Sequence, residues 1–129
     1  MLAQVTSSGA AETLLSKGSF HGGNYAPADT ASGGVSLVRV ENGAYELRLS
    51  DDFSTTPGPD LFIYLSASAD PADGDAITGN DYVDAGKLAS PTGGQKMPLP
   101  PNFDPEKFKS VAIWCKQFSI LFGAAALSK

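Results

Sequence analysis

VSLVRVENGAYELRLS, residues 35–50, contains the clearest signal of the fold in this chain. At its centre, Asn42 and Gly43 form the dipeptide preferred in two-residue hairpin turns, because both residues tolerate a positive φ. A two-residue turn at this point places Val38 opposite Leu47 in an antiparallel pair. One face of the pair is then apolar and the other is charged. The stretch therefore predicts a half-buried antiparallel hairpin.

Further strands are expected along the rest of the chain. Leu61–Leu65 is apolar at every position, with aromatic and aliphatic side chains on opposite faces, which predicts a central strand covered on both sides. A short strand is expected at Tyr82–Val83 or Gly86–Leu88. Prolines close Gln95–Leu99, which favours an edge strand. Ser110–Cys115 alternates like a strand, with Val111, Ile113 and Cys115 on one face and Ala112 and Trp114 on the other.

The apolar pattern changes parity after the last of these strands. Apolar residues occupy odd positions up to Cys115 and even positions from Phe118 onward. A period of two cannot change parity without an irregularity, so we expect a bulge or turn at Lys116-Gln117. The total is about seven or eight short strands without a long amphipathic helix. This pattern predicts an all-β fold, either an antiparallel β-sandwich or a partly open barrel.

The length of 129 residues suits one domain, and 14 Gly and 9 Pro indicate many turns. Residues 1–17 are small and polar and are expected to form a flexible N-terminal arm. Residues 18–129 are expected to form a single β domain. No apolar run reaches the roughly 18 residues that a membrane-spanning helix needs. The start shows no signal peptide, although Met1–Gln4 would suit the remnant of a trimmed one.

Charge and composition exclude several functions. The net charge of −5 argues against a nucleic acid or an anionic membrane as partner. A single Cys rules out an intrachain disulfide and a cysteine-only zinc site, and a single His rules out two-histidine metal sites. There is no Gly-x-Ser-x-Gly motif, so a hydrolase is not indicated. We therefore do not expect a stand-alone enzyme.

Cys115 is the first candidate for a functional residue. It follows Trp114 at an expected strand end, where it would suit a redox-active thiol or a soft ligand to a metal or haem iron. The simpler alternative is a small buried apolar residue. His21 and Met97 are further candidates for haem ligands. A surface histidine and an edge-strand apolar residue are the corresponding structural interpretations.

An acidic segment gives a second candidate site. Asp70, Asp73 and Asp75 surround a glycine, and carboxylates on a flexible loop are suitable calcium ligands. The spacing does not match the helical calcium-binding loop, and a solvated acidic loop is the alternative. These residues suggest a binding or adhesion module as a second functional hypothesis. Aromatic residues such as Tyr64 and Trp114 would suit either a sugar-binding face or cross-strand packing.

Four segments in order resemble the DM13 domain family. They are Lys17–Phe20, Gly34–Leu37, Gly58–Leu65 and Val111–Gly123. The similarity extends through Gly86–Leu88, Gly94-Gln95 and Leu99-Pro100 and covers the chain from about Lys17 to its end. The C-terminal segment, VAIWCKQFSILFG, is the most specific part.

The resemblance implies a β-rich module from an exported protein, periplasmic or at the cell surface. DM13 domains occur alone or beside DOMON and cytochrome b561 domains, and a role in electron transfer has been proposed for them. The cysteine of the family corresponds to Cys115. We therefore expect a redox role that involves this thiol and a partner protein or cofactor, with haem as one candidate. Because no second cysteine is present, a thiol mechanism would need that external partner.

Overall fold

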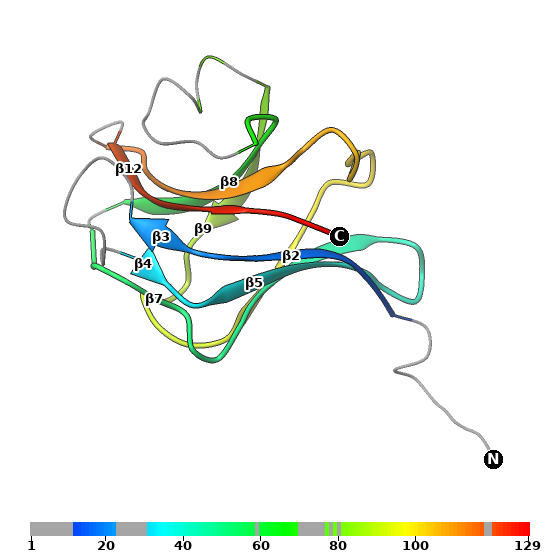
Figure 1. Cartoon of the computed structure of the whole chain (residues 1–129), viewed down its shortest axis with the longest axis horizontal. Helices are drawn as coiled ribbons and strands as arrows, with labels where there is room; N and C mark the ends of the chain where they lie inside the picture. Colours follow the sequence, from blue (N-terminus) through cyan, green and yellow to red (C-terminus); the bar gives the residue numbers. More distant parts are fainter. Residues whose placement is uncertain are drawn as a thin grey trace.

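The structure, a computed structural model, is an antiparallel β-sandwich, as Figure 1 shows. It describes residues 12–22, 31–58, 60–69, 77, 79, 81–117 and 120–129. Among these residues no sheet closes into a barrel, so the sandwich rather than the barrel is confirmed. No helix in the described ranges has both the length and the apolar character needed to cross a membrane.

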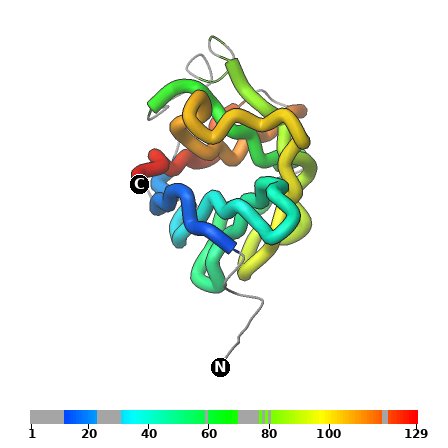
Figure 2. The backbone as a smooth tube through the Cα atoms, turned by 90° about the vertical axis from the view of Figure 1, so that its right-hand side faces the viewer, coloured from blue at the N-terminus to red at the C-terminus, as the bar shows by residue number. Residues whose placement is uncertain are grey.

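Two main sheets face each other and form the layers of the sandwich. The four-stranded sheet has the order β10 (Gln95–Pro98), β6 (Tyr45–Leu49), β5 (Gly34–Arg39) and β2 (Thr13–Ser19). The five-stranded sheet has the order β3 (His21–Gly22), β12 (Ile120–Ala126), β11 (Ser110–Cys115), β8 (Leu61–Ser66) and β9 (Tyr82–Lys87). A small third sheet pairs β4 (Ala31–Ser32) with β7 (Ser54–Thr55). The tube in Figure 2 shows the two main layers from the side.

The strand count agrees with the sequence prediction. Eight strands in the described part of the chain have four or more residues, and the other three have only two. The expected edge strand at Gln95–Leu99 is β10, at the edge of its sheet. The two alternatives near Tyr82 and Gly86 are one strand, β9.

The strand β8 has two apolar faces, as its sequence predicts. Leu61, Ile63 and Leu65 belong to the core between the sheets. Tyr64 lies in a second apolar cluster on the outer face of the five-stranded sheet, and Phe62 packs against that cluster. Because β8 lies between β11 and β9, its backbone is paired on both sides. It is therefore the central strand that the continuous apolar run predicts.

The register of the hairpin between β5 and β6 differs from the predicted one. Leu37 rather than Val38 lies opposite Leu47, so the predicted register was wrong by one residue. The reason is a three-residue turn: the Gly43 N–H donates to the Val40 carbonyl over 2.9 Å, and Gly43 has a φ of 86°. This is a type I turn followed by a glycine bulge, a common alternative to the two-residue turn.

The parity change after β11 has two sources. The expected turn at Lys116-Gln117 is confirmed. In addition, Ile113 pairs with Gly123 whereas Trp114 pairs with Leu121, so Phe122 is an extra residue in β12. This bulge lets Phe122 join the inner core while Leu121 faces the outer cluster.

The two sheets meet along β2 and the end of β12. The Lys17 N–H donates to the Ser128 carbonyl over 3.0 Å, and the Ser128 N–H returns a bond of 2.9 Å. A Cβ at Gly18 would lie 2.1 Å from the Ala126 carbonyl oxygen, so only glycine allows this approach. Because β2 begins at Thr13 and Leu15 packs against the core, sheet structure begins before the expected end of the arm at residue 17. Residues 1–11 lie outside the described ranges.

Candidate functional site

Cys115 lies at the end of β11 on the inner face of the five-stranded sheet. Its side chain is 0% exposed and belongs to the core between the sheets. Its neighbours in register are Leu61 on β8 and Ile120 on β12, both apolar. A thiolate can attack a disulfide only if it is accessible, so exchange with a partner thiol would require β11 to open.

The other two haem-ligand candidates lie in different places. Met97 on β10 is buried in the same core as Cys115, across the interior from β11. His21 is exposed on β3. It lies opposite Ala124 on β12, which in turn lies opposite Ala112 on β11. Ala112 belongs to the outer cluster. His21 and Cys115 therefore belong to opposite faces of the sheet. Because a closed apolar core surrounds the sulfur and the imidazole lies on the other face, these residues do not fit a shared haem.

The three acidic candidates for calcium ligands lie outside the described residues. Asp70, Asp73 and Asp75 fall in the undescribed part of the loop, so the calcium site stays a prediction. Nearby, the Lys107 ammonium donates a hydrogen bond to the Asp81 carboxylate and forms an ion pair with it at 2.7 Å. This hydrogen bond holds the Asp81 pKa below its usual value. Within the described ranges, no group of three or more His, Cys, Asp or Glu residues could hold a metal ion.

Three aromatic rings form a stack on the outer face of the five-stranded sheet. Tyr64 on β8 is the middle ring. The Tyr82 ring on β9 lies parallel to it, with 4.9 Å between centroids and 4° between planes, and Trp114 on β11 stacks on the other side at 6.0 Å. Tyr64 and Trp114 are 4% exposed, whereas Tyr82 is 45% exposed. The stack therefore runs from Trp114, which precedes Cys115 in β11, to the surface.

The strand register explains why these rings meet. Trp114 lies opposite Phe62, and Tyr82 lies opposite Ser66, so each stacks diagonally on Tyr64 between them. Such diagonal neighbours are within reach of aromatic side chains. The sequence indicated that aromatic residues alternate on β8 and gave cross-strand packing as one of two interpretations of Tyr64 and Trp114. The pairing of β8 with both neighbours was needed to bring the three rings together. We call Tyr82, Tyr64 and Trp114 the aromatic stack.

Lys116, in the turn after β11, places a positive charge next to the aromatic stack. The Lys116 ammonium lies 4.0 Å from the centroid of the Phe62 ring and 3.0 Å from an Asp84 carboxylate oxygen. The hydrogen bond to Asp84 raises the Lys116 pKa. Burial raises the pKa of Tyr64, so its phenol stays neutral over a wider pH range.

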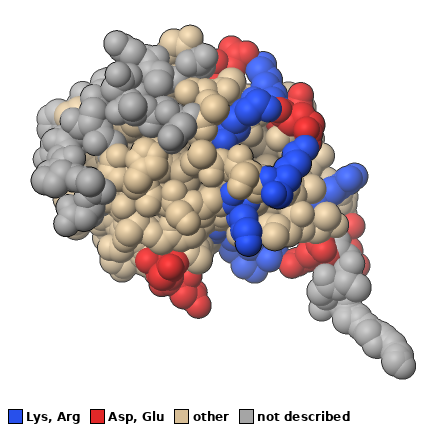
Figure 3. All heavy atoms as spheres, viewed as in Figure 1, with Lys and Arg blue, Asp and Glu red and all other residues tan. Residues whose placement is uncertain are grey.

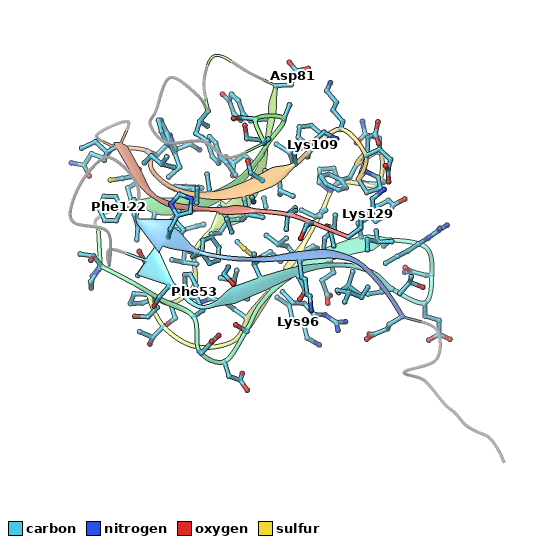
Figure 4. All side chains as sticks on the ribbon, in the orientation of Figure 1. Phe53, Asp81, Lys96, Lys109, Phe122 and Lys129 are labelled. Atoms are coloured by element: carbon cyan, nitrogen blue, oxygen red, sulfur yellow. The ribbon has the colours of Figure 1, made fainter. Side chains whose placement is uncertain are left out.

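Several charged side chains elsewhere in the described ranges are paired with opposite charges. Figure 3 shows basic side chains gathered toward one end of the visible face, with acidic ones among them. Lys129 pairs with Glu106 at 2.7 Å, and Arg48 pairs with both Glu12 and Glu46. In the stick view of Figure 4, Asp81 and Lys96 lie on opposite outer sides of the sandwich. These pairs favour a mixed surface over a basic stripe of the kind that binds phosphates.

Comparison with known proteins gives one family. A family model described as electron transfer DM13 matches residues 24–127, which is most of the chain and includes Cys115 and the aromatic stack. No curated protein and no solved structure matches the chain.

Proposed function

Because this chain belongs to the DM13 family, which is named for electron transfer, we propose that it is a small redox module with Cys115 as its redox-active residue. It acts together with a redox partner rather than as a stand-alone enzyme. The observation that carries the proposal is the family match across residues 24–127, because it spans the whole strand β11. The burial of Cys115 then limits the mechanism.

The buried Cys115 thiol is better suited to one-electron transfer than to thiol–disulfide exchange. An exchange mechanism needs sulfur-to-sulfur contact with a partner, which the closed core around Cys115 prevents. A one-electron step needs no such contact. The Cys115 thiol would be oxidised to a thiyl radical by giving one electron to a radical acceptor and its proton to solvent, and the thiyl radical would regain one electron and one proton from a donor. No haem iron takes part in this step.

Export to the periplasm or the cell surface is a further part of the proposal. It is supported by the family resemblance of the sequence. Fractionation of cells that express the gene with its natural upstream sequence would test it. Recovery of the protein only from the cytoplasm would contradict export.

The redox role is tested by comparing the wild-type protein with Cys115→Ala in protein-film voltammetry. We expect a one-electron wave in the wild type that is absent from Cys115→Ala and is distinct from the tyrosine and tryptophan oxidation that both proteins share. A matched control is Met97→Leu, which changes the other buried sulfur in the same core and should keep the wave. Identical voltammograms for the wild type and Cys115→Ala would contradict a redox role for the thiol.

Thiol accessibility provides a second measurement. A thiol reagent should label Cys115 only after denaturation, since its side chain is 0% exposed in the native state. Labelling of the folded protein at the rate of a free thiol would instead support exchange with a partner.

A further inference from the structure

We propose that the aromatic stack is an electron route between the interior beside Cys115 and a contact point at Tyr82 on the surface. The proposal deepens the redox function proposed above, but the geometry that carries it is independent of the thiol. Three oxidisable rings follow each other at 6.0 Å and 4.9 Å, and only the last of them is substantially exposed.

The arrangement suits stepwise transfer because each ring is held by a different strand of one sheet. Trp114, Tyr64 and Tyr82 come from β11, β8 and β9, which are hydrogen-bonded neighbours. Ile77, Ala112 and Leu121 pack around the two inner rings, and these two rings are nearly closed to solvent. A diffusing molecule therefore reaches Tyr82 far more easily than Trp114.

An ion pair between Lys116 and Asp84 lies beside the aromatic stack. Asp84 lies opposite Tyr64 in register, and Lys116 pairs with Asp84 while its ammonium covers the Phe62 ring. Both of these charged groups also act on the Tyr64 phenol electrostatically, with opposite signs. Burial is the main cause of the raised Tyr64 pKa and keeps its phenol neutral, so oxidation of the phenol has to be coupled to movement of its proton.

Each step along the aromatic stack moves one electron together with one proton. The thiyl radical that the proposed step leaves on Cys115 takes one electron and one proton from Trp114, which restores the thiol and leaves a neutral indolyl radical. Tyr64 then supplies an electron and a proton to the indole, and Tyr82 supplies an electron and a proton to Tyr64. Tyr82 is left as a neutral phenoxyl radical. A donor such as a hydroquinone restores it by giving one electron and one proton, and becomes a semiquinone.

The test uses the fact that Trp114 is the single tryptophan. A laser pulse photoionises Trp114 in the intact protein, nitrous oxide removes the ejected electron, and transient absorption follows the tryptophan and tyrosine radicals. In the wild type we expect the tryptophan radical to convert to a tyrosine radical at a rate independent of protein concentration. Added hydroquinone should then remove the tyrosine radical quickly.

Three variants locate the route. Tyr64→Phe should lose the fast conversion, because phenylalanine cannot be oxidised under these conditions. Tyr82→Phe should keep the conversion but leave a radical on Tyr64 that hydroquinone removes slowly. Tyr45→Phe is the matched control, since the ring of Tyr45 packs on Phe103, outside the stack, and should behave like the wild type.

The result that overturns the proposal is unchanged conversion in Tyr64→Phe, which would show that electrons bypass the stack. Cys115→Ala separates this proposal from the redox role of the thiol. Conversion that persists in Cys115→Ala supports a route that works without the thiol, whatever voltammetry shows for Cys115. Loss of conversion in Cys115→Ala, with the fold intact by circular dichroism, would contradict an independent stack.

Discussion

The two faces of strand β11 carry different kinds of side chain in different surroundings. On the inner face, Val111, Ile113 and Cys115 are all 0% exposed, in a core closed by the opposite sheet. On the outer face, Trp114 is also buried, but it begins a series of rings that ends at the exposed Tyr82. The inner face of β11 is therefore closed to solvent, whereas its outer face carries the first ring of a series that reaches the surface. Trp114 and Cys115 are neighbours in sequence, but their side chains lie on opposite faces of the sheet.

The largest expected effect is on the inner face, from Ile113→Ala. Its side chain is fully buried between the sheets, so truncation leaves a cavity and should lower the free energy of unfolding by about 2–5 kcal/mol. Urea denaturation measures the change, with Ile113→Val as the milder control at about 0.5–1.5 kcal/mol. A loss below about 1 kcal/mol for Ile113→Ala would mean that the inner face is not close-packed.

Cys115→Ser tests whether the surroundings of the sulfur are as apolar as the inner face implies. A hydroxyl placed in this core without a partner should cost about 1–3 kcal/mol in the free energy of unfolding. Cys115→Ala keeps the site apolar and should cost about 1 kcal/mol. Equal losses for the two variants in urea denaturation would point to a polar group near the sulfur and would weaken the contrast between the faces.

On the outer face, Tyr82→Ala should have a smaller effect on stability. Tyr82 is partly exposed and its main contact is the parallel ring of Tyr64, so removing the ring should cost about 0.5–1.5 kcal/mol. Thermal unfolding compared with Tyr82→Phe, which retains the stack, measures the contribution of the ring contact. A loss as large as that of Ile113→Ala would show that the outer face also carries the core of the fold.

The smallest expected effect is a loss of stability at alkaline pH that originates on the outer face. Burial raises the Tyr64 pKa, so the unfolded chain ionises first, at about pH 10. Stability is fully present below that pH and is lost as the pH rises through the raised pKa of the folded state. The Lys116 pKa, raised by the hydrogen bond to Asp84, acts in the same direction.

Urea midpoints measured from neutral pH to above pH 10 would show this loss. Tyr64→Phe should flatten the alkaline part of the curve, and Tyr64→Phe with Lys116→Met should flatten it further. An unchanged curve in both variants would mean that the titrating groups lie elsewhere.

Sequence patterns predicted correctly those strands and turns whose structure depends on a single segment of the chain. The continuous apolar run of Leu61–Leu65 predicted a central strand, and the prolines after Gln95 predicted an edge strand. The turn at Lys116-Gln117 followed from the parity change alone. The hairpin register was not predicted, because Asn42-Gly43 suits both a two-residue turn and a three-residue turn with a glycine bulge.

The candidate site divides in the same way. Cys115 was identified from its position and from the family resemblance, but its exposure depends on the opposite sheet, which no local pattern describes. The separation of His21 from Cys115 also required the pairing of β3 with β12. Cross-strand packing of Tyr64 and Trp114 was one of two alternatives from the sequence. The order of the rings in the aromatic stack could not be predicted, because the three residues meet only through strand order and register.

The sequence by itself determined the all-β class, the main strands, the two-faced character of β8 and β11, and the membership in the DM13 family. These properties depend on alternation within short segments and on residue order, which are local. The tertiary structure decided which face of β11 is sealed and which leads to the surface. That choice depends on cross-strand register, on bulges such as the one at Phe122, and on packing of the second sheet. All three are set by contacts between distant parts of the chain.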